Sequence, residues 1–296
     1  MRTTTLALLF LVLLFPLPAP GGGDVPVAAA AGAFPVRLSA GQPAQGDLLV
    51  VEATPPPGAD NVVMVWKGRE IPMREEGAGR FLGLVGVDLL EPPGTAVLSV
   101  RGSQEGETFR VESRIEVRKG TFPVQELTLP KSMTQFDAAT LERISREARA
   151  LEERFSRVFS PPAWSFPFLP PVAEYRPKGF GVRRLINGEP RSPHAGVDVD
   201  LPAGTPVVAI ADGAVTFAGE QFFGGNSVVL DHGGGLFSIY YHLQDIAVSE
   251  GRKVARGERI GAVGASGRAT GPHLHFGVRA AGGRIDPSLL FSLPSR

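Results

Sequence analysis

The chain has 296 residues, of which 43% are hydrophobic and 20% charged, a balance that suits two folded domains and excludes a globally disordered protein. Its 30 basic residues cancel its 30 acidic residues, so the sequence gives no sign of a nucleic-acid partner. Cysteine is absent, which excludes disulfides, thiol nucleophiles and thiolate zinc sites and leaves histidine and carboxylate side chains as metal ligands.

Residues 1–33 have the pattern of a signal peptide followed by a flexible N-terminus. Arg2 precedes an apolar run, Leu6 to Phe15, that is short for a membrane span, which needs about 20 residues. Small residues at 28–33 offer cleavage sites. We therefore predict an exported protein of the periplasm or cell envelope, with secretion or an uncleaved membrane anchor as alternatives.

Residues 34–120 are predicted to form a β-sandwich of immunoglobulin-like type. Apolar and charged residues alternate over 109–118, the period of a half-buried strand. Shorter strands are expected at 48–52, 62–66, 81–85 and 96–100, separated by turn sequences such as EPPG. Because no titratable cluster stands out, we interpret this domain as a spacer or docking module.

Residues 121–178 are interpreted as a helical connector followed by a proline- and aromatic-rich linker. Apolar residues recur every three or four positions over 136–160, and Asp137 is a plausible helix N-cap. The stretch PPAWSFPFLPP at 161–171 is too rich in proline for a helix or a central strand. It is either a plain linker or a strap that packs on or over the next domain. A regulatory hypothesis places this strap, or the helix before it, over an active-site groove.

Residues 179–296 are glycine-rich and contain short runs typical of strands. The expected strands are 207–210, 214–217, 227–230, 237–241 and 274–278. All five histidines of the protein fall in this region: His194, His232, His242, His273 and His275. Their concentration in one β-rich domain is the first indication of a functional site.

Three segments of this region carry groups that bind metals or transfer protons. In SPHAGVDVD, His194 and Asp198 would lie about 13 Å apart on a straight strand, so a bend at Gly196 is needed to bring them to one ion, and Asp200 is a competing carboxylate. In TGPHLHF, His273 and His275 share one face of a strand.

The third segment is SIYYHLQD. Regular alternation would put Tyr240 and His242 on one face and Tyr241 on the other. Three nitrogen or oxygen ligands plus a water make an open zinc site, so the expected set comes from His194, Asp198 and one or both of His273 and His275.

These segments, in this order, resemble the lysostaphin-type (LytM-like) zinc metallopeptidases. The similarity covers roughly residues 179–291 and rests on SPHAGVDVD, SIYYHL and GASGRATGPHLHFGV. It implies a C-terminal, mainly antiparallel β catalytic domain with a groove over one zinc ion. The chain as a whole is thus expected to be mainly β. The family cleaves peptide bonds in the cross-links or stems of peptidoglycan, which would be the partner of this chain.

The resemblance also implies roles for particular residues. His194, Asp198 and His275 would bind zinc, which chooses Asp198 over Asp200. His242 and His273 would be the catalytic histidines. Two further roles are expected: Tyr240 would hold substrate or the developing oxyanion, and His232 would be structural.

An alternative from another class is a non-catalytic LytM-like regulator that activates a different wall hydrolase. Such members typically lack zinc ligands or catalytic histidines, whereas all five positions are filled here. The enzyme is therefore the favoured interpretation.

Overall fold

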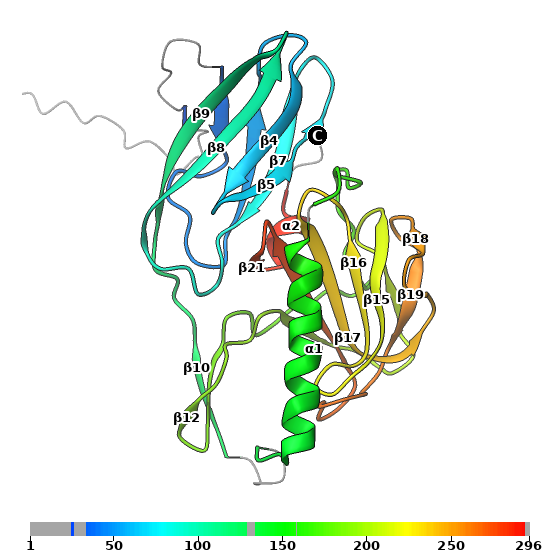
Figure 1. Ribbon diagram of the computed structural model, residues 1–296. Coiled ribbons are helices and arrows are strands. Elements are labelled where there is room, and N and C mark those ends of the chain that lie inside the picture. The colour runs from blue at the N-terminus through cyan, green and yellow to red at the C-terminus, as the bar shows by residue number, and fades with distance from the viewer. Residues whose placement is uncertain (1–24, 27–33, 129–133, 158, 294–296) are drawn as a thin grey trace, which may run out of the picture.

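The computed structural model describes residues 25–26, 34–128, 134–157 and 159–293 of this chain. Two β-rich bodies lie one above the other in Figure 1, and one long helix runs beside the lower body. The prediction of a mainly β chain is confirmed.

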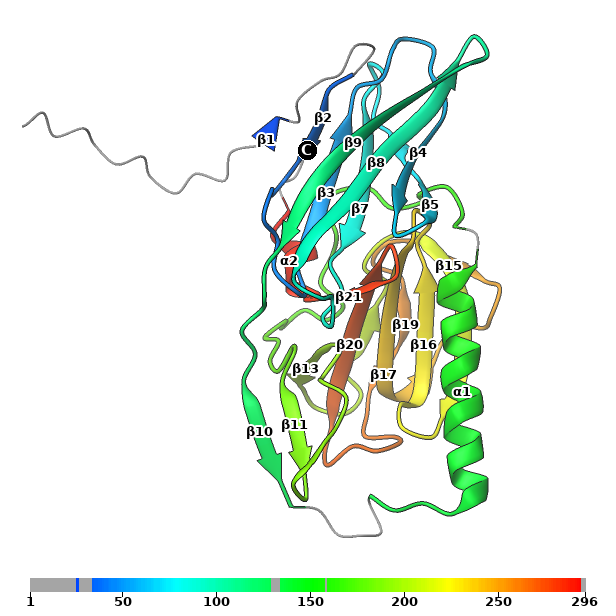
Figure 2. The ribbon, with the colours of Figure 1, turned by 60° about the vertical axis from the view of Figure 1, so that its left-hand side comes forward.

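The upper body is a sandwich of two antiparallel sheets (Figure 2). One sheet has the order β1-β2-β3-β7-β6 and the other β5-β4-β8-β9. Their bounds are β1 Val25–Pro26, β2 Val36–Leu38, β3 Leu48–Ala53, β4 Asp60–Trp66, β5 Arg69–Pro72, β6 Arg74–Glu75, β7 Phe81–Gly86, β8 Gly94–Gln104 and β9 Glu107–Val117. The alternation expected over 109–118 is real: the apolar residues of β9 at 111, 115 and 117 point into the core and its charged residues to solvent.

The lower body is built on a nine-stranded sheet whose main path is β13-β20-β17-β16-β15-β18. Its strands are β13 Val197–Asp200, β14 Pro206–Val208, β15 Gly213–Gln221, β16 Gly225–Asp231, β17 Leu236–Ile246, β18 Lys253–Val254, β19 Arg259–Val263, β20 His273–Ala280 and β21 Gly283–Ile285. The short helix α2, Ser288–Phe291, follows. The five strands predicted here correspond to β14, β15, β16, β17 and β20.

The helix predicted over 136–160 is α1, Ala138–Ser156. Asp137 caps it as expected, because its carboxylate accepts a hydrogen bond from the Thr140 N–H at 2.8 Å. The helix lies along one face of the lower sheet, next to β15, β16 and β17 (Figures 1 and 2). Contacts fix that face: Glu152 pairs with Arg279 of β20, and Phe155 packs edge-on against Phe237 of β17.

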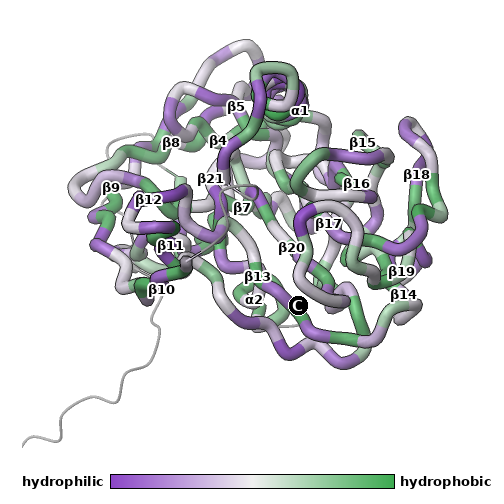
Figure 3. The backbone as a smooth tube through the Cα atoms, turned by 90° about the horizontal axis from the view of Figure 1, so that it is seen from below, coloured by the Kyte–Doolittle hydropathy of each residue, from purple (hydrophilic) through white to green (hydrophobic). Residues whose placement is uncertain are grey.

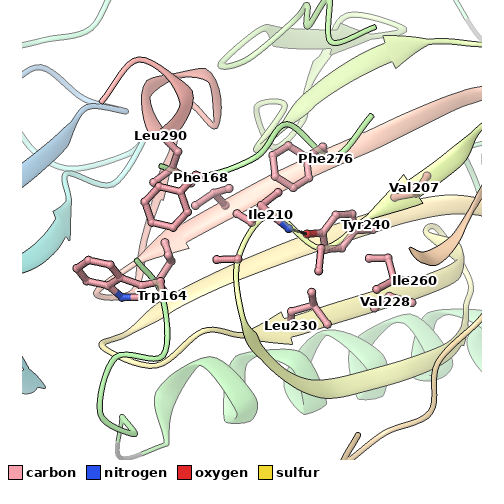
Figure 4. Packing of buried hydrophobic residues seen from close by; sticks show 14 of the residues in the cluster. Trp164, Phe168, Val207, Ile210, Val228, Leu230, Tyr240, Ile260, Phe276 and Leu290 are labelled. Carbon is pink, nitrogen blue, oxygen red and sulfur yellow. Dashed lines mark hydrogen bonds between the residues drawn. The ribbon is translucent and has the colours of Figure 1, made fainter. Parts of the chain in front are cut away.

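The proline-rich strap packs on the opposite face of the same sheet. Trp164 and Phe168 are buried in the cluster that contains Tyr240 and Phe276 (Figure 4). Backbone hydrogen bonds tie the strap to the sheet, from the Ala163 N–H to the His232 carbonyl at 2.8 Å and from the Leu169 N–H to the Ile210 carbonyl at 2.9 Å. Of the two alternatives for this segment, the strap packs on the domain as part of its core.

A small sheet that the sequence did not predict joins the connector to the lower body. Strand β10, Val124–Leu127, pairs in parallel with β11, Arg183–Ile186, which pairs with β12, Glu189–Pro190. The connector therefore contributes a strand beside the region of the predicted zinc ligands.

The predicted signal segment, up to residue 24, lies outside the described residues. Within the stretch expected to be flexible, Val25–Pro26 pairs with β2. Neither helix in the described part of the chain is long and apolar enough to cross a membrane.

Candidate active site

A cavity of about 480 Å³ opens where β13, β17 and β20 approach the β10–β12 sheet. Figure 3 looks at the molecule from this end, with β10, β11 and β12 on the left and β13, β20 and β17 to their right. Its lining residues are Gln125, Leu127, Arg184, Ile186, His194, Asp198, Phe223, Gly224, Tyr241, His242, Arg268, Ala269, Thr270, His273 and His275. All five predicted zinc-binding and catalytic residues are among them.

Strand pairing brings the three predicted metal ligands together. Asp198 of β13 lies directly opposite His275 of β20 in the antiparallel register. His194 precedes β13, so the chain has turned before the strand begins, and the 13 Å expected for a straight strand does not apply. Gly196 permits this packing, because a Cβ there would lie 2.8 Å from Nε2 of His275. The competing carboxylate, Asp200, is exposed and pairs with Lys178.

The three ligand atoms point at one another. Nε2 of His194 lies 2.9 Å from Nδ1 of His275 and 3.1 Å from Oδ1 of Asp198, and His275 Nδ1 is 2.9 Å from the same oxygen. The Nδ1–H of His194 donates to the Gly179 carbonyl at 2.8 Å, so its Nε2 carries a lone pair when the ring is neutral.

A divalent cation would satisfy all three of these converging lone pairs. One proton on His275 Nδ1 serves only one of its two neighbours at a time, whereas all three atoms could hold a cation together. Two imidazole nitrogens and one carboxylate oxygen are typical ligands of an open zinc site. The donor set therefore fits zinc, and the second hydrogen bond of His194 fixes its ring in the manner usual for zinc-bound histidine.

Burial and charge set the protonation states that metal binding requires. Burial lowers the pKa of His275, which keeps its imidazole neutral. Burial opposes ionisation of Asp198, but hydrogen bonds to His194 and His275 outweigh it and hold the pKa of the carboxyl well below its usual range. Both groups are thus in the forms that bind metals.

His242 and His273 lie side by side next to this cluster, with ring centroids 4.7 Å apart. Nδ1 of His242 is 2.9 Å from the Ser266 carbonyl, and Nδ1 of His273 is 2.9 Å from the Gly271 carbonyl. A carbonyl only accepts, so in each ring Nδ1 carries the hydrogen and Nε2 of the neutral ring is free to accept a proton. Burial lowers the pKa of His242 to about 4, so this ring is neutral near pH 7.

The structure places Tyr240 away from the cavity, unlike the position expected for it, because a β-bulge breaks the alternation of β17. Tyr240 pairs with Val228 of β16 but Leu243 pairs with Asn226, so Tyr241 and His242 together oppose one residue. His242 has the left-handed φ of 62°. Tyr240 is completely buried on the core side, where its hydroxyl accepts from the Ile210 N–H at 3.3 Å (Figure 4).

Tyr241 instead joins His242 at the cavity. Its ring stacks on His275 with an interplanar angle of 15° and a centroid separation of 5.4 Å. The bulge thus puts two consecutive residues of β17 on the functional side of the sheet. A single sequence contains no pattern that marks this irregularity.

Helix α1 and two glycines position the loop that forms one wall. Glu147 of α1 accepts a hydrogen bond from the Phe222 N–H at 2.8 Å, and Phe136 packs edge-on against Phe222 and Phe223. Gly225 and Gly267 lie so close together that a Cβ on either would clash with backbone atoms. This contact holds the segment around Ser266, whose carbonyl orients His242.

Sequence reasoning missed the wall on the other side. Gln125 and Leu127 come from β10 and Arg184 and Ile186 from β11. None belongs to a motif with a chemical signature, and a strand contributed by the connector became visible only through the parallel pairing of β10 with β11. No residue of the strap at 161–171 lines the cavity, so the described structure does not place the strap over it.

His232 is separate from this site and makes structural contacts, as expected. It is completely buried; its Nδ1 is 2.8 Å from the Asp212 carbonyl and its Nε2 is 2.7 Å from Oγ of Ser238. Ser238 in turn is 3.0 Å from the Tyr240 hydroxyl. These bonds form a closed polar network within the core.

Comparison with known proteins gives consistent matches. The sequence profile of Peptidase family M23 matches residues 192–287. Over 98 residues, 33% of this chain, the sequence is 46% identical to the peptidoglycan DD-endopeptidase ShyA of Vibrio cholerae, of which 23% is covered. Over 94 residues, 32% of this chain, it is 46% identical to the DD-carboxypeptidase/endopeptidase Mpg of Neisseria meningitidis, of which 22% is covered. The chain thus spans under a quarter of the length of these curated relatives.

One solved structure matches nearly the whole chain. It is the crystal structure of a peptidase M23 from Pseudomonas aeruginosa, 31% identical in sequence, with a TM-score of 0.66. The match covers 84% of this chain and 95% of that one, so it includes the sandwich and the connector as well as the sheet with the metal ligands. The chain belongs to peptidase family M23.

Proposed function

We propose that this chain is an exported zinc metalloendopeptidase that hydrolyses peptide bonds in peptidoglycan cross-links or stem peptides. The observation that carries the proposal is the convergence of His194, Asp198 and His275 beside His242 and His273 in one cavity. The names of the relatives support the substrate class, because those from Vibrio cholerae and Neisseria meningitidis are a peptidoglycan DD-endopeptidase and a DD-carboxypeptidase/endopeptidase.

The proposed mechanism divides the work between the ligands and the two catalytic histidines. Zinc held by His194, Asp198 and His275 supplies a lowered pKa for a bound water and polarisation of the scissile carbonyl. His242 and His273 each have Nδ1 anchored to a backbone carbonyl, which leaves Nε2 as the nitrogen that can exchange a proton. One ring would take a proton from the attacking water on its Nε2 and, as the imidazolium so formed, would donate that proton to the leaving amine.

Rigid orientation of both rings favours this chemistry. The Gly271 carbonyl holds His273 with its Nε2 3.8 Å from Oδ1 of Asp198, beside the three residues that would hold the ion but outside that set. The Ser266 carbonyl holds His242 next to it. Pre-set orientation lowers the entropic part of the activation barrier.

The proposed location is the cell envelope, on the periplasmic or outer side. It is supported by the signal-like sequence of residues 1–33 and by the relative from Vibrio cholerae, which is named for peptidoglycan. Peptidoglycan is accordingly the proposed partner.

The test combines metal analysis with digestion of purified cross-linked peptidoglycan. We expect one zinc per chain, release of soluble fragments, loss of that release with a chelator, and recovery on addition of zinc. A zinc-free protein that cleaves no wall but stimulates an amidase would instead identify the non-catalytic regulator and contradict the proposal.

A further inference from the structure

A second cavity of about 380 Å³ adjoins the cavity that is lined by the proposed metal ligands. Arg184, Ile186, Phe223 and Arg268 line both, so the two spaces share a wall. The second is completed by Thr134, Phe136, Arg191 and Ser192. Three arginines therefore line it, and its lining among the described residues includes no carboxylate.

Arg184 connects this space to the metal ligands. It belongs to β11, and one terminal nitrogen of its guanidinium is 3.9 Å from Oδ2 of Asp198. Its Nε is buried and has no hydrogen-bond partner in the described part of the chain. A buried donor without a partner is costly, which indicates that something outside the chain completes the site.

Arg268 is held in place by an aromatic ring rather than by an acid. Its guanidinium carbon lies 4.2 Å from the centroid of the Phe223 ring, and its backbone N–H donates to the Phe223 carbonyl at 3.0 Å. No ion pair of Arg191 or Arg268 occurs between residues that the structure describes. Stacking on Phe223 leaves the polar edge of the guanidinium available for a ligand.

The positive charges of the three arginines repel one another. Partial burial, together with the charges of Arg184 and Arg191, lowers the pKa of Arg268. Only Arg184 has an acidic neighbour among the described residues, Asp198, and gathering like charges with so little counter-charge opposes folding. The arrangement is suited to an anion that arrives with the substrate.

We propose that Arg184, Arg191 and Arg268 bind a free carboxylate of the peptide substrate, on the β11 side of the scissile bond. The proposal rests on the proposed function and names the chemical form of peptide that this site prefers. Guanidinium groups bind carboxylates through paired, charge-assisted hydrogen bonds, which an amide in the same place does not reproduce. The site therefore distinguishes a free carboxylate from its amidated form.

The test uses two synthetic cross-linked stem peptides that differ only at the carboxyl group of the diamino acid next to the cross-link, free in one and amidated in the other. For the full-length, zinc-loaded protein we measure kcat/KM for both peptides, and we measure their Kd by titration calorimetry with zinc-loaded His273→Ala, which should turn them over too slowly to disturb the titration. The free carboxylate is expected to be favoured at least about tenfold in both quantities, the size of one charge-assisted hydrogen bond. The preference in kcat/KM should come mainly from KM.

Arg191→Gln and Arg268→Gln should each reduce the preference for the free carboxylate, and the double variant should abolish it. Arg183→Gln is the matched control, since Arg183 is the exposed neighbour of Arg184 on β11 and lines neither cavity. It should keep the wild-type preference. Arg268→Lys should keep part of the binding that Arg268→Gln loses, because lysine retains the charge without the paired donors.

Equal kcat/KM and equal Kd for the two peptides would contradict the carboxylate site but remain consistent with the proposed peptidase activity. Selective binding of the free carboxylate without cleavage of either peptide would have the opposite meaning. It would retain the site and overturn the proposed catalytic function.

Discussion

A single buried histidine and a cluster of histidines with one aspartate lie on opposite sides of the same sheet, and they differ in how their polar atoms are satisfied. On the core side, His232, Ser238 and Tyr240 form a closed network that ends on backbone groups. On the cavity side, atoms of His194, Asp198 and His275 meet with lone pairs facing one another. The comparison teaches that the completeness of hydrogen bonding, more than burial, separates a structural histidine from a metal ligand.

The largest effect is expected from a substitution in the cavity cluster that would bind the metal. His275→Ala removes one of the three proposed ligands, and the two that remain should hold zinc far more weakly. We expect zinc content to fall close to zero and turnover to drop by roughly 10³-fold or more. Elemental analysis and peptidoglycan digestion of the same preparation measure both.

His273→Ala should separate metal binding from catalysis. The ring of His273 neighbours the ligand set without belonging to it, so zinc content should stay near one per chain. Turnover should fall by roughly 10²- to 10⁴-fold, the usual contribution of a positioned acid or base. If this variant lost zinc while His275→Ala kept both zinc and activity, the division of roles would be reversed.

His232→Ala disrupts the hydrogen-bond network in the core and should lower the stability of the fold. It leaves the Asp212 carbonyl and the Ser238 hydroxyl without their partner and opens a cavity, which costs about 3 kcal/mol in the free energy of unfolding. Denaturant unfolding gives this difference. Zinc content and kcat per folded molecule should remain at the wild-type level, and a loss of either would assign His232 to the active site.

The same histidine predicts a pH dependence of stability. Burial lowers the pKa of His232 to about 4 in the folded chain, below the value of about 6.5 in the unfolded chain. Between these values the unfolded chain binds more protons, so the contribution of His232 is complete above about pH 6.5 and is lost as pH falls toward 4. The stability difference between wild type and His232→Ala should shrink over this window. A difference that stays constant from pH 7 to 4 would show that His232 is not buried in its neutral form.

The smallest expected effects distinguish the two consecutive tyrosines of β17. Tyr240→Phe removes a hydroxyl that serves Ile210 and Ser238, so it should lower stability by about 1–2 kcal/mol without changing kcat. Tyr241→Ala removes the ring stacked on His275, and we expect zinc to bind about tenfold more weakly. Zinc titration and unfolding curves measure these two effects in both variants. Loss of kcat in Tyr240→Phe alone would support the role in holding substrate or oxyanion that was expected from the sequence.

Regular periodicity is what made most of the fold predictable. The alternation in β9 and the three-to-four spacing in α1 each follow from one face buried against a neighbour. The proposed zinc-binding and catalytic positions were reached through motif resemblance, because spacing alone left Asp198 and Asp200 equivalent. Because of the bulge at Tyr241 and His242, the prediction of which β17 side chains face the cavity failed. One extra residue in the strand reverses the side to which every later side chain points.

The walls of the site were unpredictable for a different reason. Arg184, Arg268 and Phe223 meet only because β10 adds to β11 and two glycines let separate loops touch. Such contacts join segments far apart in the chain and leave no local pattern. The proline-rich strap offered two alternatives that depended on tertiary packing, and the burial of Trp164 in the core decided between them.

Mass spectrometry of the fragments that the full-length, zinc-loaded chain releases from purified cross-linked peptidoglycan tests the central claim most directly. The account predicts that cross-linked dimers disappear and that monomers with a new amine and a new carboxylate at the cut peptide bond accumulate, in wild type but not in His273→Ala. Intact dimers after incubation with zinc-loaded wild type, or identical fragments from wild type and His273→Ala, would contradict it.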